Sequence, residues 1–329
     1  MGHIFKPGKK DYPLLTTIWE ASVRATHHFL SEQEILFYKP LVEEDYLPSA
    51  DLYCITDGLL PCGFMGIAGS HLEMLFVHPD TIGKGYGKQL LEYAIQNLGV
   101  STVDVNEQNT HALDFYLYNG FEITGRDALD GQGRPFPILH LKLTSPEPIS
   151  INAETALYRI RLSDAQEIFR VIDTQREYLG RWLPFVAGTK RLSDSETFVK
   201  SIVYFPFNKQ EPTFVIRRNG TFAGLIGFVN TDRTNRKTEI GYWLCKQFQG
   251  QGIMTSAVKI LCDMAFREAG LNRIQIKCAV GNLPSNKIPL RLGFVAEGVE
   301  RAGEQIMPGK FLDLNIYSKL KTENTLFDE

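Results

Sequence analysis

The sequence predicts two homologous α/β domains in tandem, and three observations carry this prediction. First, 329 residues exceed what a single hydrophobic core usually serves. Second, an ordered series of strands, a glycine-rich turn and helices occurs twice along the chain. Third, "TSPEPIS" at residues 144–150 places two prolines among small polar residues between apolar segments, a composition typical of a linker.

The elements of the first half follow from hydrophobic periodicity. A helix is predicted around residues 16–30, a second helix follows the glycine-rich "IGKGYGKQLL" at 82–91, and a short third helix covers 110–118. Strands are predicted at residues 51–58, 61–69, 71–77, 102–105, 120–124 and 138–143. The glycine-rich segment therefore lies between a strand and a helix.

The second half repeats this order. Helices are predicted around 164–178, 193–204, from 253 to 269, and at 285–292. Strands are predicted at residues 213–218, 222–229, 237–244 and 273–280, with "GFVAEG" following the last helix. Asn109 precedes Gly120 by 11 residues, and Asn282 precedes Gly293 by the same 11, so the repeat extends beyond the glycine loops.

The predicted domains are residues 1–144 and 154–329, joined by a linker at 145–153. Their compositions differ, because residues 1–150 carry 10 Lys and Arg against 19 Asp and Glu, whereas the rest carries 25 against 19. The first half is therefore acidic and the second basic. We expect the two halves to present different surfaces, and plausibly to meet different partners.

Composition excludes several classes of protein. With 43% hydrophobic and 22% charged residues the chain is expected to be globular. It has no apolar run of about 20 residues and no secretory signal, so we expect a cytoplasmic protein without a membrane partner. Five scattered cysteines and the adjacent His27 and His28 lack the spacing of metal ligands, so no metal is expected. No basic stretch is interleaved with aromatic residues, which argues against direct nucleic-acid binding.

The glycine loop at 82–91 indicates a phosphate site of a particular kind. A P-loop needs four residues between its glycines and Ser or Thr after Lys, but Lys88 is followed by Gln89. A dinucleotide-binding loop needs a third glycine at position 88 and a place at the start of a βαβ unit, and both are lacking. An acyl-CoA loop remains.

Here the sequence resembles the GCN5-related N-acetyltransferase (GNAT) family, whose signature is Gln/Arg-x-x-Gly-x-Gly/Ala. The second copy matches it from Gln249 to Gly252 and departs only at Met254, while the first has Ile82 in place of Gln or Arg. Backbone N–H groups at a helix start bind pyrophosphate without a particular side chain, so both loops are expected to bind acetyl-CoA. The resemblance assigns CoA binding to Val77, Ile82, Gly83, Lys84, Gly85, Tyr86, Gly87, Lys88 and Asn109, and to Gln249, Gly250, Gln251, Gly252, Ile253, Met254, Asn282 and Ser285.

The resemblance covers most of both halves. "NTHALDFYLYNGF" and "NLPSNKIPLRLGF" are similar to the segment that follows the loop in this family. "YLGRWLPF" and "EIGYWL" resemble the ribosomal-protein N-terminal acetyltransferase (RimJ/RimL-type) branch, while "SVRATHHFL" and "HLEMLFVHP" resemble small bacterial acetyltransferases. The family implies mixed, mostly antiparallel, twisted sheets flanked by helices.

The function implied is transfer of acetyl from acetyl-CoA to a primary amine by direct attack. The acceptor would be a small-molecule amine or a protein N-terminus. An alternative is that one domain, more readily the first because of Ile82, is a non-catalytic acyl-CoA-binding or scaffolding module. The sequence leaves the acceptor and the oligomeric state open.

The chemistry requires a base for the amine and an acid for the departing thiolate. In the first half His71 and Glu73 lie two residues apart and are expected on one face of a strand. Tyr116, seven residues after Asn109, stands where the family often has its thiolate acid, and Tyr118 is the neighbour most easily confused with it. The alternatives are a solvated Glu73 and a packing role for Tyr116.

In the second half the position seven residues after Asn282 is Pro289, which has no proton to donate. Ser285 offers a hydroxyl instead, although a serine at a helix start can also be an N-cap. The candidate bases are Glu239 and Glu304, or these are exposed carboxylates. Trp182, Leu183 and Phe185 are then expected to line an acceptor groove, or to be core.

Overall fold

The computed structural model describes residues 2–58, 60–144, 147–205 and 211–324. The chain forms two compact units, with the division at residues 145–146. Of the segment predicted as a linker, residues 145–146 lie outside the described residues. Ile149–Asn152 form strand β8 and pair with β9 (Thr155–Arg159), so these four residues belong to the second sheet.

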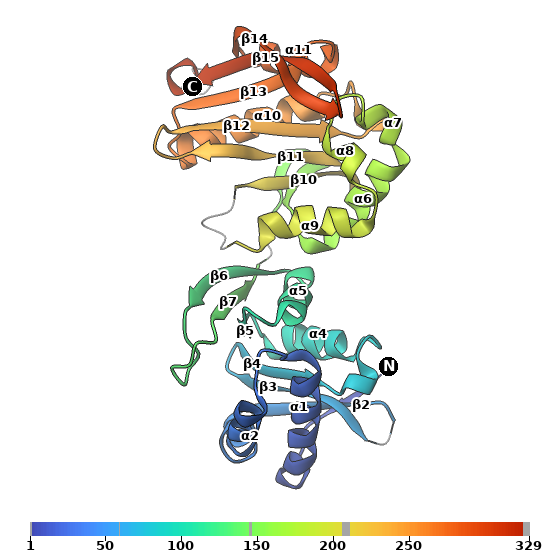
Figure 1. The fold of residues 1–329 in the computed structure, drawn as a ribbon, viewed down its shortest axis with the longest axis vertical. Helices are drawn as coiled ribbons and strands as arrows, with labels where there is room; N and C mark the ends of the chain where they lie inside the picture. Colours follow the sequence, from blue (N-terminus) through green and yellow to red (C-terminus); the bar gives the residue numbers. More distant parts are fainter. Residues whose placement is uncertain (1, 59, 145–146, 206–210, 325–329) are drawn as a thin grey trace. The chain divides into compact units, whose positions relative to one another are not determined.

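The first unit is built on a seven-stranded sheet in the order β1-β2-β3-β4-β5-β7-β6 (Figure 1). Every neighbouring pair is antiparallel except β4 with β5, so the expected mixed, mostly antiparallel sheet is confirmed. The strands are β1 (His3–Phe5), β2 (Asp51–Thr56), β3 (Pro61–Ala68), β4 (His71–Val77), β5 (Thr102–Asn106), β6 (Phe121–Asp127) and β7 (Ile138–Leu143).

Helices cover both faces of this sheet. They are η1 (Lys9–Asp11), α1 (Tyr12–Thr26), α2 (Glu32–Leu41), η2 (Val42–Tyr46), α3 (Leu47–Ser49), η3 (Pro79–Thr81), α4 (Tyr86–Leu98) and α5 (Thr110–Tyr118). Met74 and Phe76 pack with α1, whereas Leu75 and Val77 approach Gly87 of α4, as expected for alternating side chains on a strand. Helix α1 begins four residues earlier than predicted because Pro13 suits a first helical turn.

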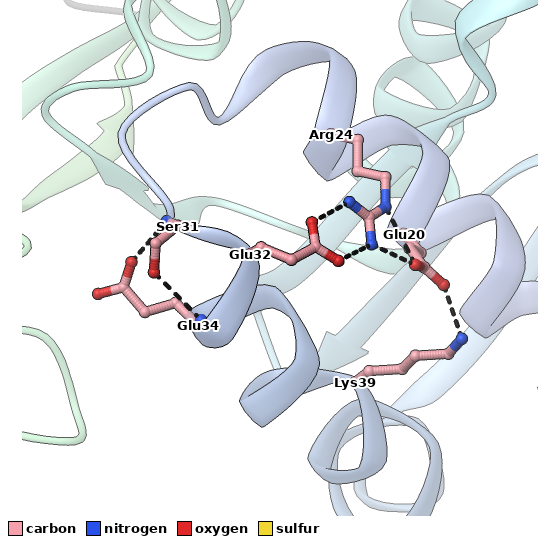
Figure 2. A network of polar contacts seen from close by, with 6 residues as sticks. All are labelled: Glu20, Arg24, Ser31, Glu32, Glu34 and Lys39. Atoms are coloured by element: carbon pink, nitrogen blue, oxygen red, sulfur yellow. Dashed lines mark hydrogen bonds and ion pairs between the residues drawn. The ribbon is translucent and has the colours of Figure 1, made fainter.

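A network of charged side chains joins α1 to α2 (Figure 2). Arg24 of α1 bonds to Glu20 one turn earlier at 2.8 Å and to Glu32 of α2 at 2.5 Å. Lys39 closes the network on Glu20 at 2.7 Å. Each ion pair is partly exposed and contributes little stability alone. Together they link α1 and α2 on either side of the turn that contains His27.

The second unit has an eight-stranded sheet in the order β14-β15-β13-β12-β11-β10-β9-β8. Only β12 and β13 run parallel, so the two sheets share one design. After β8 and β9 its strands are β10 (Thr213–Arg218), β11 (Thr221–Asp232), β12 (Lys237–Leu244), β13 (Arg273–Ala279), β14 (Val295–Met307) and β15 (Lys310–Leu320). The long β14–β15 hairpin was not predicted.

The helices of this unit are η4 (Leu162–Asp164), α6 (Ala165–Thr174), α7 (Arg176–Leu179), α8 (Phe185–Gly188), α9 (Leu192–Val203), η6 (Lys246–Phe248), α10 (Ile253–Asp263), η7 (Met264–Glu268), α11 (Leu283–Arg291) and η8 (Lys321–Glu323). Ala257 and Leu261 of α10 and Ile274 of β13 are fully buried members of one hydrophobic core. Across the residues that the structure describes, no helix is long and apolar enough to cross a membrane.

Candidate active sites

The two glycine loops adopt the same backbone conformation. Gly83 and Gly85 have φ of 82° and 84°, and Gly250 and Gly252 have φ of 72° and 76°. Gly85 is the N-cap of α4 and Gly252 is the N-cap of α10, so each loop delivers the chain to a helix start. Both loops therefore present helix N-terminal N–H groups to an anion, as the repeat predicts.

Each sheet opens beside its loop. Strands β4 and β5 pair only through His71 with Thr102 and Leu72 with Val103. Strands β12 and β13 pair only from Lys237 to Glu239. Beyond these pairs the parallel strands diverge, and in the first unit the pocket is lined by both diverging strands.

The pocket of the first unit gathers most of its predicted site residues. Those that line it are Glu73, Val77, Ile82, Gly83, Gly85, Tyr86, Gly87, Lys88, Asn109 and Tyr116. Lys84 lies outside this lining, and its ammonium is 3.5 Å from the carboxylate of Asp57. Its ammonium thus lies beside Asp57 in this structure, and CoA binding by Lys84 stays a prediction.

Glu73 and His71 do not share a face. Leu72 pairs with Ile67 and Met74 with Gly66, which leaves Glu73 as the extra residue of a β-bulge. Glu73 lines the pocket, while Nδ1 of His71 is 3.0 Å from Oγ1 of Thr102. The bulge breaks the alternation on which the prediction rested, and Glu73 alone faces the site.

Exposure separates the two candidate tyrosines. Tyr116 is 6% exposed with its ring against Phe115 and Phe121, whereas Tyr118 is 53% exposed. Burial raises the pKa of Tyr116, so its hydroxyl keeps its proton at neutral pH. Tyr116 thus has both the packing role and the protonated hydroxyl that were considered as alternatives.

His27 makes a contact with Asn109 that was not predicted from the sequence. Its Nε2 is 3.3 Å from Nδ2 of Asn109, and its Nδ1 is 2.8 Å from Oγ1 of Thr26. The Thr26 hydroxyl donates to the carbonyl of Ser22, so it accepts from Nδ1–H, and Nε2 accepts from Asn109. Burial lowers the pKa of His27 to about 4, which keeps the imidazole neutral.

A pocket of the second unit surrounds the second loop. It is lined by Gln249, Gly250, Gln251, Gly252, Ile253, Met254, Asn282 and Ser285, as predicted. Lys287 and Arg291 of α11 also line it, and no carboxylate does, among the residues that the structure describes. The amide of Gln249 donates to the hydroxyl of Tyr178. We call this the donor pocket, since its charge suits an anionic CoA.

Ser285 belongs to a cluster of polar side chains in this pocket. Its Oγ is 3.1 Å from Sγ of Cys278 and 3.3 Å from the hydroxyl of Tyr242. Asn282 occupies the N-cap of α11, so the N-cap role considered for Ser285 is wrong. Burial raises the pKa of Tyr242, a residue that no sequence pattern singled out by itself.

A second pocket of about 810 Å³ lies between the sheet and α6 and α9. Leu183, Tyr242 and Trp243 line both it and the donor pocket, so the two pockets are neighbours at these residues. Glu304 lines it, as expected for an acceptor-side carboxylate. We call it the acceptor groove.

The three residues expected in an acceptor groove have different positions. Phe185 lines the acceptor groove, and Leu183 lines both pockets. Trp182 lines the donor pocket instead, beside Gly281, so its predicted acceptor position is wrong. Its position follows from the turn after α7, which carries Trp182 toward α11.

Glu239 lines neither of these pockets. It is half-buried on β12, and burial raises its pKa, with Glu300 and Glu304 adding to the effect and Lys277 opposing it. Lys277 is itself 3.0 Å from Glu300. The carboxylate of Glu304, which lines the acceptor groove, thus acts on the pKa of Glu239, which lies outside it.

Comparison with known proteins decides the family of the chain. A model of the acetyltransferase (GNAT) domain matches residues 155–295, and a second model of the same description matches residues 48–123. The peptidyl-lysine N-acetyltransferase YjaB of Salmonella typhimurium is 45% identical over 131 residues, 39% of this chain and 88% of that relative. The chain belongs to the GNAT acetyltransferase family.

Further relatives of the GNAT domains agree with this assignment. The putative ribosomal N-acetyltransferase YdaF of Bacillus subtilis is 36% identical over 179 residues, 53% of this chain and 94% of that relative. The microcin C7 self immunity acetyltransferase MccE, solved with acetyl-CoA and AMP, is 33% identical with a TM-score of 0.50, over 54% of this chain and 97% of that chain. The protein is thus an acyltransferase with two GNAT domains, and the predicted fold is confirmed.

Proposed function

We propose that both GNAT domains bind acetyl-CoA and transfer its acetyl group directly to a primary amine. The observation that carries this is the meeting of two oppositely charged pockets in the C-terminal domain. The donor pocket contains Lys287 and Arg291, and the acceptor groove contains Glu304. A cationic amine and an anionic CoA would approach Tyr242 and Trp243 from opposite sides.

The side chains at this meeting point have the chemistry that the transfer needs. A peptide α-ammonium has a pKa of about 8 and an alkylammonium one of about 10, and either must lose a proton before it attacks. Glu304 faces the groove, and Glu239, whose pKa is raised in part by Glu304, would receive that proton through water. As the C–N bond forms and the C–S bond breaks, the Ser285 hydroxyl, which donates to the Tyr242 hydroxyl, would give its proton to the sulfur and take up the second proton that the nitrogen loses.

In the N-terminal domain we propose a lysine side chain as the acceptor. Glu73 would be the base and Tyr116 the acid, and the pocket also contains Asp104, a charge suited to a cationic amine. The match to the peptidyl-lysine N-acetyltransferase YjaB covers 131 residues, fewer than this domain contains. The match to YdaF covers 179 residues, more than this domain contains. This domain is also the acidic half of the chain.

One observation favours the alternative of a non-catalytic N-terminal module. In the C-terminal domain, Lys287 and Arg291 lie five and nine residues after Asn282. In the N-terminal domain, the residues at the same distances after Asn109 are Asp114 and Tyr118. The first pocket thus lacks two cations that would help to hold CoA.

The test uses the full chain with Gly85→Asp or Gly252→Asp, which introduces a carboxylate at one loop at a time. Calorimetry with acetyl-CoA counts the remaining sites, and thiol release with a lysine peptide or an N-terminal amine assigns turnover. We expect one binding site and one acceptor class to disappear with each variant. Binding at the first loop without turnover supports the module, and no binding at either loop contradicts the proposal.

A further inference from the structure

We infer that the acceptor of the C-terminal domain carries a bulky apolar group next to its amine, as a peptide that begins with Leu or Phe does. This inference rests on the proposed function of that domain and names its class of substrate. Three features of the acceptor groove lead to it: its apolar wall, its charge and its continuity with the donor pocket.

The wall of the groove is apolar and partly unfilled. Ile172 of α6, Ile202 of α9 and Phe228 of β11 line it, and Phe185 and Phe198 lie at its side, each 43% exposed. Exposed aromatic side chains gathered around a cavity of about 810 Å³ leave apolar surface in water, which a matching apolar group would cover.

The charge of the groove fits an amine. Glu211 and Glu304 are the charged residues that line it, with no Lys or Arg, in the part of the chain that the structure describes. Glu211 already accepts the backbone N–H of Thr231 at 2.6 Å. Glu304 has no hydrogen-bond or ion-pair partner among the described residues, so its carboxylate is available to a cation that enters the groove.

Continuity with the donor pocket fixes the direction of the acceptor. Tyr242 and Trp243 line both pockets, so the proposed transfer needs the attacking nitrogen at that end of the groove. The first side chain of the acceptor would then extend between Phe198 and Phe228, where apolar groups form the wall. A first residue of Ser or Ala would leave this surface in contact with water.

The pocket of the N-terminal domain provides a contrast. Glu73, Lys88 and Asp104 all line it, so charged side chains are spread around its wall. We expect no comparable preference for an apolar neighbour there. The selectivity would be a property of α9 and β11 in the C-terminal domain.

The experiment measures kcat/KM of the full chain for lysine-free peptides that differ only in their first residue. In these peptides the α-amine is the one primary amine. We expect Leu and Phe to exceed Ser and Ala by about ten-fold or more, the scale of burying one such side chain. Phe198→Ser should reduce this ratio several-fold, and Phe198→Leu should largely restore it.

Phe311→Ser is the matched control, because Phe311 is a 51% exposed phenylalanine of the same domain that does not line the groove. Equal rates for all four peptides, or a ratio that Phe198→Ser leaves unchanged, would overturn the inference while leaving N-acetyl transfer intact. If acetyl-CoA binds but no peptide or small amine is acetylated, the proposed function itself fails.

Discussion

Nε2 of His27 accepts a hydrogen bond from Nδ2 of Asn109, which joins the end of α1 to the start of α5. Asn109 in turn accepts the backbone N–H of Ala112 as an N-cap. Helix α5 carries Tyr116, the proposed acid. His27 thus positions the helix that holds the acid, from a turn fixed by the network of Figure 2.

Replacing His27 tests this relationship. His27→Leu keeps an apolar shape but leaves the Asn109 amide without its acceptor, a loss of about 1 kcal/mol. We expect kcat for lysine acetylation to fall about five-fold. His27→Gln, which offers an acceptor oxygen, should recover part of it. His28→Gln is the control, and an equal effect there would contradict the positioning role.

The stability of the N-terminal domain should depend on pH through His27. Its pKa is about 4 in the folded state, below the usual 6.5, so the unfolded chain binds a proton more readily. The stability that depends on a neutral His27 is fully present above pH 6.5 and is lost progressively as the pH falls from 6.5 to about 4. Melting temperatures of the parent and of His27→Gln should converge across this window, and a parallel decline would refute the assignment.

Ser285→Ala removes the hydroxyl proposed to protonate the thiolate. We expect kcat for N-terminal amines to fall about 100-fold, while the Kd of acetyl-CoA changes little. Tyr242→Phe should have a smaller effect, because Tyr242 acts through Ser285. Ser193→Ala, on the exposed side of α9, serves as control. Full activity of Ser285→Ala would exclude Ser285 as the acid.

The two carboxylates of the C-terminal domain should differ in their pH signature. Because burial raises the pKa of Glu239, its base form should appear at higher pH than that of an ordinary glutamate, and kcat/KM should rise with pH accordingly. Glu239→Gln should lower the rate and remove this rise. Glu304→Gln should chiefly raise KM for cationic amines and leave the pH profile unchanged. If instead Glu304→Gln removes the rise with pH and Glu239→Gln raises KM, Glu304 is the base and Glu239 binds the amine.

Gly252→Ala tests the backbone of the second loop. A φ of 76° costs an alanine about 1 kcal/mol, so the N-terminus of α10 should shift and the Kd of acetyl-CoA should rise about five-fold. Gly188→Ala is the control, since a Cβ there would meet nothing within 4 Å and Gly188 is not among the positive-φ glycines. Unchanged affinity in Gly252→Ala would show that the loop tolerates alanine.

The sequence predicted the loops and most strands because their signals are local. Glycines at fixed spacing and apolar alternation are read within about ten residues, and both donor loops are where the repeat places them. The acid candidates Tyr116 and Ser285 followed from their distance to an asparagine and do line the two pockets. Their roles as acids stay predictions.

Features that depend on register or on distant segments were missed. The bulge at Glu73 is a property of the pairing of β3 with β4, which no alternation pattern contains. The contact of His27 with Asn109 joins residues 82 positions apart. The corresponding helix of the C-terminal domain, α11, has a different anchor. Nδ2 of Asn286 donates to the carbonyl of Ala279, and its Oδ1 accepts from the Tyr317 hydroxyl. The repeat therefore did not predict the contact of His27.

Leu183, Tyr242 and Trp243 form walls of both the donor pocket and the acceptor groove. An adjustment of these side chains to one ligand would change the surface offered to the other, so the two proposed binding equilibria would share a coupling free energy. This coupling is reciprocal: the factor by which acetyl-CoA alters acceptor affinity is the factor by which the acceptor alters the affinity for acetyl-CoA.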